Sequence, residues 1–127
     1  MSTNRSSTSV RAVRGAITAA ADTSDEIVAA TAELLGEMIA RNGIAHDDIV
    51  SVVFTATPDL TAEFPAAAGR VVGISDIPLL CATEIEVAGA VGRCVRVLMH
   101  VHTERERSEL RHVYLRDARQ LRTDLPE

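Results

Sequence analysis

The chain has 127 residues, of which 46% are hydrophobic, and a net charge of −5. This length allows one domain with a sizeable core, and this apolar content excludes a disordered protein. The negative charge and the aromatic content of 2% argue against a nucleic-acid surface. No apolar run approaches the roughly 20 residues that a membrane helix needs.

Residues 1–9 are polar and rich in Ser and Thr, without the apolar stretch of a secretory signal. We expect them to form a disordered polar tail, and residues 10–127 to form a single domain in the cytoplasm. The two cysteines, Cys81 and Cys94, lack metal-ligand spacing and are expected to be free thiols. All 13 basic residues are arginine, whose planar fork suits carboxylate partners.

The first third of the chain alternates strand and helix. The pattern predicts a strand over 10–18 that contains Arg14. It then predicts a long helix, which opens with a capping box at Thr23 to Glu26 and ends at Asn42 and Gly43.

The middle of the chain adds a buried strand and a second helix. The run 49–57 is apolar nearly throughout, which is typical of a strand buried on most of its surface. The Ala-rich stretch 61–72 predicts a short helix with Pro65 in its first turn.

The last third is mainly strands. Pro78 restricts the first of them to a sheet edge or to its own beginning, and Gly89 and Gly92 mark a turn. A highly charged run is expected to form a helical turn, and the stretch after residue 115 to have low regularity. The expected strands are 77–83, 93–103 and 112–115, and the charged run is 104–110.

This order of elements, without an internal repeat or a linker, argues for an α+β or α/β sandwich: a mixed β-sheet with helices on one face. We expect the α+β form.

The most informative residue is Arg96, which lies in the apolar strand 93–103. A guanidinium keeps its charge, so its burial without a partner is very costly. Two interpretations stay open at this point. Arg96 either pairs with a nearby Glu at an exposed edge, or it meets a ligand that brings negative charge. Strand alternation predicts one face with Val95, Val97, Met99 and Val101, and the other with Cys94, Arg96, Leu98 and His100.

No phosphate-binding loop, dinucleotide motif or nucleophile elbow is present. His100 and His102 share a strand face, but no third metal ligand is evident. Several cations, one acid and a phenol suit a small polyanionic ligand that also carries a hydroxyl. The set lacks a nucleophile, so it fits binding, or a reaction accelerated by orientation and electrostatics. These residues are Arg14, Arg70, Arg96, Arg122, Glu84 and Tyr114.

The order and spacing of several short segments resemble the monofunctional chorismate mutases of the trimeric α/β-barrel type, not the all-helical type. The resemblance runs from about residue 10 to about residue 125. The segments are Val13 to Ala16, Thr55 to Leu60 (TATPDL), Phe64 to Ala66 (FPA), Pro78 to Cys81, Arg96-Val97, Arg111 to Leu115 (RHVYL) and Leu121-Arg122.

The resemblance implies a pericyclic (Claisen) rearrangement of chorismate to prephenate, a step in phenylalanine and tyrosine biosynthesis. The enolpyruvyl ether C–O bond breaks while a C–C bond forms, without covalent catalysis, cofactor or metal. It also implies a homotrimer that assembles as a pseudo-α/β barrel, with the sites at the subunit interfaces. No nucleic-acid or membrane partner is expected.

The resemblance assigns catalytic roles to five residues. Arg96 is expected to meet the ether oxygen, where negative charge builds as the bond breaks. Arg14 and Tyr114 hold a substrate carboxylate, Glu84 accepts a hydrogen bond from the ring hydroxyl, and Cys81 touches the polar side of the ring.

It also implies a set of substrate-binding residues around them. Ala67 stands where some members carry a Lys, and Leu80 where a Thr can occur. The expected wall residues are Phe64, Ala66 and Leu79. Those at the mouth are Arg70, Leu121 and Arg122.

Three other interpretations compete. Small enamine and imine deaminases have a similar trimeric fold and use an interfacial arginine, but their motifs are not found. A non-catalytic module that senses an anionic metabolite of the aromatic pathway would also lack a nucleophile. It would bind chorismate or prephenate without interconverting them. In a purely structural protein, the arginines would pair with the 18 acidic residues.

Overall fold

A computed structural model describes residues 8–121 of the chain. Five strands and one long helix make up most of this part. The strands are β1 (Ser9–Thr18), β2 (Ile49–Ala56), β3 (Leu79–Thr83), β4 (Cys94–Thr103) and β5 (Val113–Leu115). The helices are α2 (Ser24–Asn42) and α3 (Ala68–Val71), and the 3-10 turns are η1 (His46–Asp48), η2 (Pro65–Ala67), η3 (Arg107–Glu109) and η4 (Arg116–Leu121).

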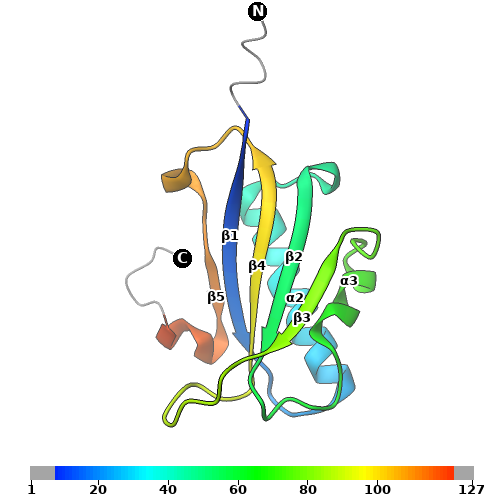
Figure 1. The fold of residues 1–127 in the computed structure, drawn as a ribbon, viewed down its shortest axis with the longest axis vertical. Coiled ribbons are helices and arrows are strands. Elements are labelled where there is room, and N and C mark those ends of the chain that lie inside the picture. The colour runs from blue at the N-terminus through cyan, green and yellow to red at the C-terminus, as the bar shows by residue number, and fades with distance from the viewer. Residues whose placement is uncertain (1–7, 122–127) are drawn as a thin grey trace, which may run out of the picture.

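The strands form a single mixed sheet in the order β3-β2-β4-β1-β5 (Figure 1). The three long strands form the centre of the sheet, where β4 lies between β1 and β2 and is antiparallel to both. The two short strands at the edges run parallel to their partners, β5 to β1 and β3 to β2. This confirms the expected mixed sheet, and Pro78 lies directly before an edge strand, as predicted.

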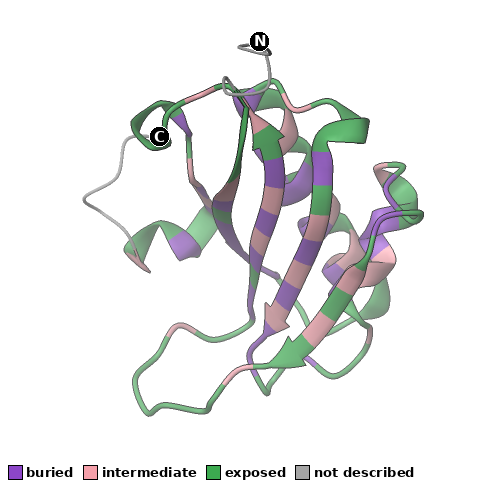
Figure 2. Ribbon diagram, turned by 45° about the horizontal axis from the view of Figure 1, so that its top comes forward, coloured by how far each residue is buried: buried purple, intermediate pink, exposed green. Residues whose placement is uncertain are grey.

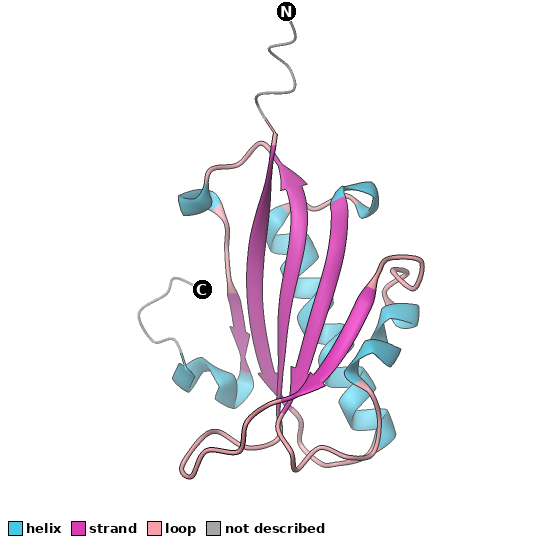
Figure 3. Ribbon diagram, in the orientation of Figure 1, coloured by secondary structure: helices cyan, strands magenta, loops and turns pink. Residues whose placement is uncertain are grey.

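Helix α2 covers one face of the sheet, and the core lies between them (Figures 1 and 3). Thr23 caps the helix by accepting a hydrogen bond from the backbone of Glu26, and Gly43 ends it in the left-handed conformation with φ 57°. The largest fully buried side chains include Ile17, Ile27, Leu34, Leu35, Met38, Phe54, Ile74 and Met99.

The opposite face of the sheet, called the open face below, carries the side chains that alternate with this core. In β4, Val95, Val97 and Met99 are buried, whereas Arg96 is exposed and Leu98 is half-buried. Bands of buried and less buried residues therefore alternate along the central strands (Figure 2). Within residues 8–121, η4 packs on one end of this face through Ala118, next to Ala16 and Cys94.

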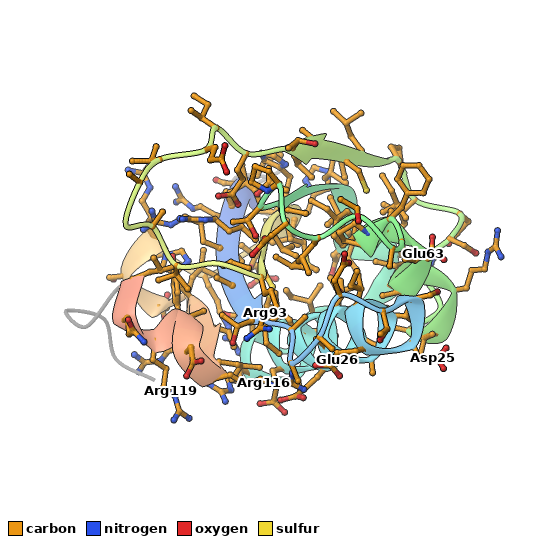
Figure 4. All side chains as sticks on the ribbon, turned by 90° about the horizontal axis from the view of Figure 1, so that it is seen from below. Asp25, Glu26, Glu63, Arg93, Arg116 and Arg119 are labelled. Atoms are coloured by element: carbon orange, nitrogen blue, oxygen red, sulfur yellow. The ribbon has the colours of Figure 1, made fainter. Side chains whose placement is uncertain are left out.

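The stretch after β5 differs from the expectation of low regularity, because it forms η4. Arg116 fixes this turn: its guanidinium donates to the carbonyl of Thr18, to Glu26 at 2.8 Å and to Glu33 at 3.0 Å. Figure 4 views this end of the molecule, where Arg116 and Glu26 lie together. Distant contacts, rather than local periodicity, hold the segment in place.

Two further predictions need correction. The expected helix over 61–72 is shorter, since only η2 and α3 form, with Pro65 at the first position as predicted. The expected capping box at the start of α2 is only half formed. The Glu26 carboxylate accepts from the backbone N–H of Ala20 instead of that of Thr23, and this bond holds the pKa of Glu26 below its usual value.

Among residues 8–121, no helix is both long and apolar enough to cross a bilayer.

Candidate active site

Arg96 and Glu84 form an ion pair at one end of the open face. The Nε of Arg96 lies 3.1 Å from Oε2 of Glu84. The acid is the more shielded partner, with 16% of its side chain exposed against 44% for the arginine. Both of the interpretations of Arg96 given above therefore have support. It pairs with a Glu, and much of its side chain still faces solvent, where a ligand can reach it.

The position of Glu84 follows from the parallel pairing of β2 and β3. Glu84 comes directly after β3, and its backbone N–H donates to the carbonyl of Ala56 at 2.9 Å. Thr55 is paired with Ala82 on one side and with Arg96 on the other. Its hydroxyl donates to the same Oε2 of Glu84 that Arg96 contacts.

Thr55 was not among the predicted site residues. The apolar run 49–57 predicts a strand buried on most of its surface, and that pattern alone gives no reason to single out its polar side chains. The signal was present nonetheless: Ser51 and Thr55 are hydroxyl residues four positions apart in an otherwise apolar strand, so both belong to one face. Without the position of Glu84, that signal does not reveal a partner.

A pocket of about 290 Å³ lies on the open face beside this pair. Arg14 enters it from β1 and Tyr114 from β5, next to Arg96. The backbone N–H of Arg14 donates to Nδ1 of His112 at 2.9 Å, which ties the two strands together here. The apolar part of the wall includes Val53 and Leu98. The pocket thus presents two guanidinium groups and a phenol, a set suited to an anion with carboxylates.

A second pocket, of about 280 Å³, lies on the other side of the edge strand β3; we call it the rim pocket. Cys81 and Phe64 line it, and Phe64 is 71% exposed. Cys81 is paired with Phe54, a core residue, so it belongs to the helix-covered face. Leu80 is paired with Val53 and belongs to the open face.

The predicted site residues therefore fall into two groups within one chain. Arg14, Glu84, Arg96 and Tyr114 lie on or beside the open face. Leu79 and Cys81 of β3 face the helix-covered side instead, where both pack against the core. The residues of η2 and α3 lie on that side too: Ala66 packs against the core, Ala67 is half-buried, and Arg70 is exposed.

The remaining predicted residues are at the C-terminal end. Leu121 packs with Tyr114 against the small cluster of Ala16, Cys94 and Ala118. Arg122 lies outside the described residues.

Asp59 fixes the entry into β4. Its carboxylate accepts from the hydroxyl of Thr57 at 2.6 Å and from the backbone N–H of Arg93 at 2.9 Å. The hydroxyl bond is the main cause of a pKa of Asp59 below the usual value. Because Arg93 directly precedes β4, this network fixes the beginning of the strand that carries Arg96.

The two thiols differ in their surroundings, and both are free. Cys94 is fully buried, and desolvation raises its pKa to about 11. Cys81 is half-buried. His100 lies 3.2 Å from the hydroxyl of Ser51. Within residues 8–121, no group of three or more His, Cys, Asp or Glu side chains has a metal-binding arrangement.

Comparison with known proteins places this chain in a family. Residues 10–125 match the family model described as chorismate mutase type I. The chain is 47% identical over 117 residues to chorismate mutase AroH of Thermus thermophilus, which covers 91% of this chain and 96% of that protein. It is 41% identical to chorismate mutase AroH of Bacillus subtilis, again over 117 residues, with 91% and 92% covered.

A solved structure gives the same result for the fold. A chorismate mutase from Clostridium thermocellum superimposes with a TM-score of 0.85 at 47% sequence identity, covering 87% of this chain and 98% of that chain.

Proposed function

The chain belongs to the type I chorismate mutase family, and we propose that Arg14, Glu84, Arg96 and Tyr114 form the catalytic half of its active site. The protein is a chorismate mutase, an isomerase that rearranges chorismate to prephenate. The enolpyruvyl ether C–O bond breaks and a C–C bond forms within one molecule. The observation that carries the residue assignment is the Arg96–Glu84 pair beside a pocket that also contains Arg14 and Tyr114.

Arg96 acts on the ether oxygen. Its Nε is held by Glu84, whereas its two terminal nitrogens make no hydrogen bond within residues 8–121. These terminal N–H groups can therefore reach the oxygen that gains negative charge as the C–O bond breaks. A fixed cation at that position stabilises the transition state more than the ground state. The barrier falls without a covalent intermediate.

Arg14 and Tyr114 hold a carboxylate of the substrate. The Arg14 guanidinium has no partner within residues 8–121, and it faces the same pocket as the phenol of Tyr114. A carboxylate held there would fix the enolpyruvyl arm over the ring. Such orientation supplies a further share of the rate, because it removes the freedom that the flexible substrate has in water.

A second subunit completes the site. Phe64 and Cys81 line the rim pocket behind β3. Within one chain, they therefore do not face a substrate bound on the open face. We assign the rim pocket of one subunit to the open face of its neighbour, in a homotrimer with three interfacial sites. The exposed apolar side chains in and after β3 support this arrangement, since contact with a neighbouring subunit would remove their apolar surface from water. They are Leu80 at 63%, Ile85 at 88% and Val87 at 61% exposed.

The other expected contacts belong to the same proposal. Arg70 and Arg122 would lie at the mouth of the site, with Leu121 beside them, and Ala66, Ala67, Leu79 and Leu80 would line its walls. A cytoplasmic location is part of the proposal, supported by two free thiols.

The first experiment measures the loss of chorismate absorbance with purified protein in buffer that contains a chelator. Prephenate is identified by its acid conversion to phenylpyruvate. We expect rapid loss with prephenate as the sole product. Saturable binding of chorismate without turnover would instead indicate a sensor of the same metabolite and would overturn the assignment of an active site.

Mixing of two inactive variants tests whether the site is shared between subunits. One variant carries Arg96→Ala, and the other carries Phe64→Ala with Arg70→Ala. Co-expression should give mixed trimers in which some interfaces have both halves intact, so activity should reappear. Activity no higher than the sum of the two variants, or a fully active monomer by light scattering, would refute the shared site.

A further inference from the structure

We propose that Thr55 is a positioning residue for this reaction: its hydroxyl fixes Glu84, and Glu84 in turn fixes Arg96. The inference rests on the proposed function, because it assigns to Thr55 a role in the same active site. Thr55 is not expected to touch the substrate's reacting atoms. It acts through the acid that orients the catalytic arginine.

The backbone places Thr55 between the two residues that it would align. β2 lies between β3 and β4, and Thr55 is paired with Ala82 of β3 and with Arg96 of β4. Glu84 follows two residues after Ala82 and is fixed to the next residue of β2, Ala56, by a backbone hydrogen bond of 2.9 Å. The side chains of Thr55 and Arg96 line the same pocket on the open face.

Both donors meet one oxygen of the acid. The Thr55 hydroxyl donates to Oε2 of Glu84 at 2.5 Å, and Nε of Arg96 lies 3.1 Å from the same atom. Oε1 of Glu84 has no hydrogen-bond partner within residues 8–121. The carboxylate is therefore oriented, with one oxygen occupied by the protein and the other left for the ring hydroxyl of the substrate.

Loss of the hydroxyl would leave Arg96 as the single donor to this carboxylate. The Glu84 carboxylate would then rotate more freely about its terminal bond. The Arg96 guanidinium, which it orients, would no longer be held in one position relative to the ether oxygen. Supporting hydrogen bonds of this kind keep functional groups within the narrow geometry that catalysis needs. A displacement of about 1 Å can cost about a hundredfold in rate.

The test compares three single variants with the wild type. Thr55→Val keeps the shape and strand preference of the residue and removes the hydroxyl, whereas Thr55→Ser keeps the hydroxyl. Ser51→Ala is the matched control, because it removes a hydroxyl from the same face of β2 that contacts His100 instead of Glu84. Melting temperature and oligomeric mass are measured for each, and Thr55→Ala replaces Thr55→Val if the latter does not fold.

We expect Thr55→Val to lower kcat by roughly tenfold to a hundredfold with a smaller change in KM. Thr55→Ser should recover most of kcat, and Ser51→Ala should leave it unchanged. A Thr55→Val enzyme with wild-type kcat would overturn the inference. So would a Thr55→Ser enzyme as impaired as Thr55→Val, because the methyl group rather than the hydroxyl would then matter.

The decisive readout is the double variant with Glu84→Ala. If Thr55 acts through Glu84, Thr55→Val should add no further loss of kcat once Glu84 is absent, whereas independent effects would multiply. Multiplied losses would therefore overturn the inference. A wild-type enzyme without turnover would refute the proposed function itself. An active wild type with an unimpaired Thr55→Val variant would refute only the role of Thr55.

Discussion

Gly15 of β1 lies directly against Met38 of α2. A Cβ on Gly15 would come to 2.5 Å from Sδ of Met38 and 3.0 Å from Cδ1 of Leu34, and both of these side chains are fully buried. The strand that carries Arg14 can therefore approach the helix closely only because a glycine follows Arg14. Gly15 thus lets the core pack closely and, as the neighbour of Arg14, also affects the position of a proposed substrate contact.

Gly15→Ala should destabilise the protein by about 1–3 kcal/mol, because the added methyl group overpacks the core. Urea unfolding measures the change. Gly36→Ala is the matched control: no atom lies within 4 Å of its added Cβ, and it is an exposed position within α2. In that control, the free energy of unfolding should rise by about 0.4–1 kcal/mol. A Gly15→Ala protein as stable as the wild type would show that Met38 moves aside without cost.

Arg96→Ala should lower kcat by roughly three orders of magnitude, because the charge on the ether oxygen loses its fixed cation. Arg96→Lys should lower kcat almost as much, since an ammonium on a different side chain cannot both bind Glu84 and reach that oxygen. Kinetics are measured on protein whose oligomeric mass and melting temperature match the wild type. Arg41→Ala, which removes an arginine paired with Glu37 on α2, should retain wild-type turnover. Near-native turnover by either Arg96 variant would disprove the assignment.

The strand face on which Arg96 lies was predicted correctly from the sequence, because strand alternation is a local property. In β4, the side chains of Arg96 and Leu98 lie on the open face and alternate with buried core residues, as a strand requires. The contact with Glu84 could not be derived from the residues alone. It depends on the alignment of β2 with both β3 and β4, which brings together Thr55 and Glu84 from positions 29 residues apart.

That Cys81 and Arg96 lie on opposite faces of the sheet could not be predicted from the sequence either, because it also depends on how the strands are aligned. Order along the chain places Cys81 three residues before Glu84, which suggests one site. The pairing of Cys81 with Phe54 turns it to the helix-covered face instead. η4 was missed because long-range bonds from Arg116, rather than apolar periodicity, define it.

The pair of His46 and Asp76 should make stability depend on pH. Their side chains lie 2.8 Å apart, and this bond raises the pKa of His46 and lowers that of Asp76. The contribution of His46 is complete below its ordinary pKa of 6.5 and is lost as the pH rises through its raised value. The contribution of Asp76 is present above its ordinary pKa of 3.8 and is lost as the pH falls through its lowered value.

We therefore expect His46→Gln to lower the melting temperature more at about pH 5.5 than at about pH 8.5. In an Asp76→Asn background, most of that difference should disappear, leaving only the weaker contact of His46 with Asp47 at 3.3 Å. An equal effect of His46→Gln at both pH values would contradict the prediction.

The two thiols should react at very different rates with a thiol reagent under native conditions. Cys94 is buried with its pKa raised to about 11, so its reactive thiolate is scarce at neutral pH. Cys81 is half-buried at the rim pocket and should react first. Labelling followed by peptide mass analysis identifies the modified residue, and Cys81→Ser should abolish the fast phase with only a modest loss of turnover. Fast labelling of Cys94 would show that the cluster around Ala118 opens readily.

Thr31 offers a stabilising change. Its side chain is fully buried within α2, and its hydroxyl has no hydrogen-bond partner among residues 8–121. Leaving a polar group in that state costs about 1–3 kcal/mol, and Val fills nearly the same volume without a polar atom. Thr31→Val should therefore raise the free energy of unfolding by about 1 kcal/mol, as measured with urea.

Thr18→Val is the matched control for that substitution. Thr18 is also buried, but its hydroxyl accepts from the backbone N–H of Asp117 at 3.2 Å, and the same exchange leaves that donor unsatisfied. It should destabilise the protein and loosen η4, because Asp117 lies in the first turn of that element. If Thr31→Val lowers stability as Thr18→Val does, then the Thr31 hydroxyl forms a bond in solution. Threonine within a helix can make such a bond to a carbonyl one helical turn earlier.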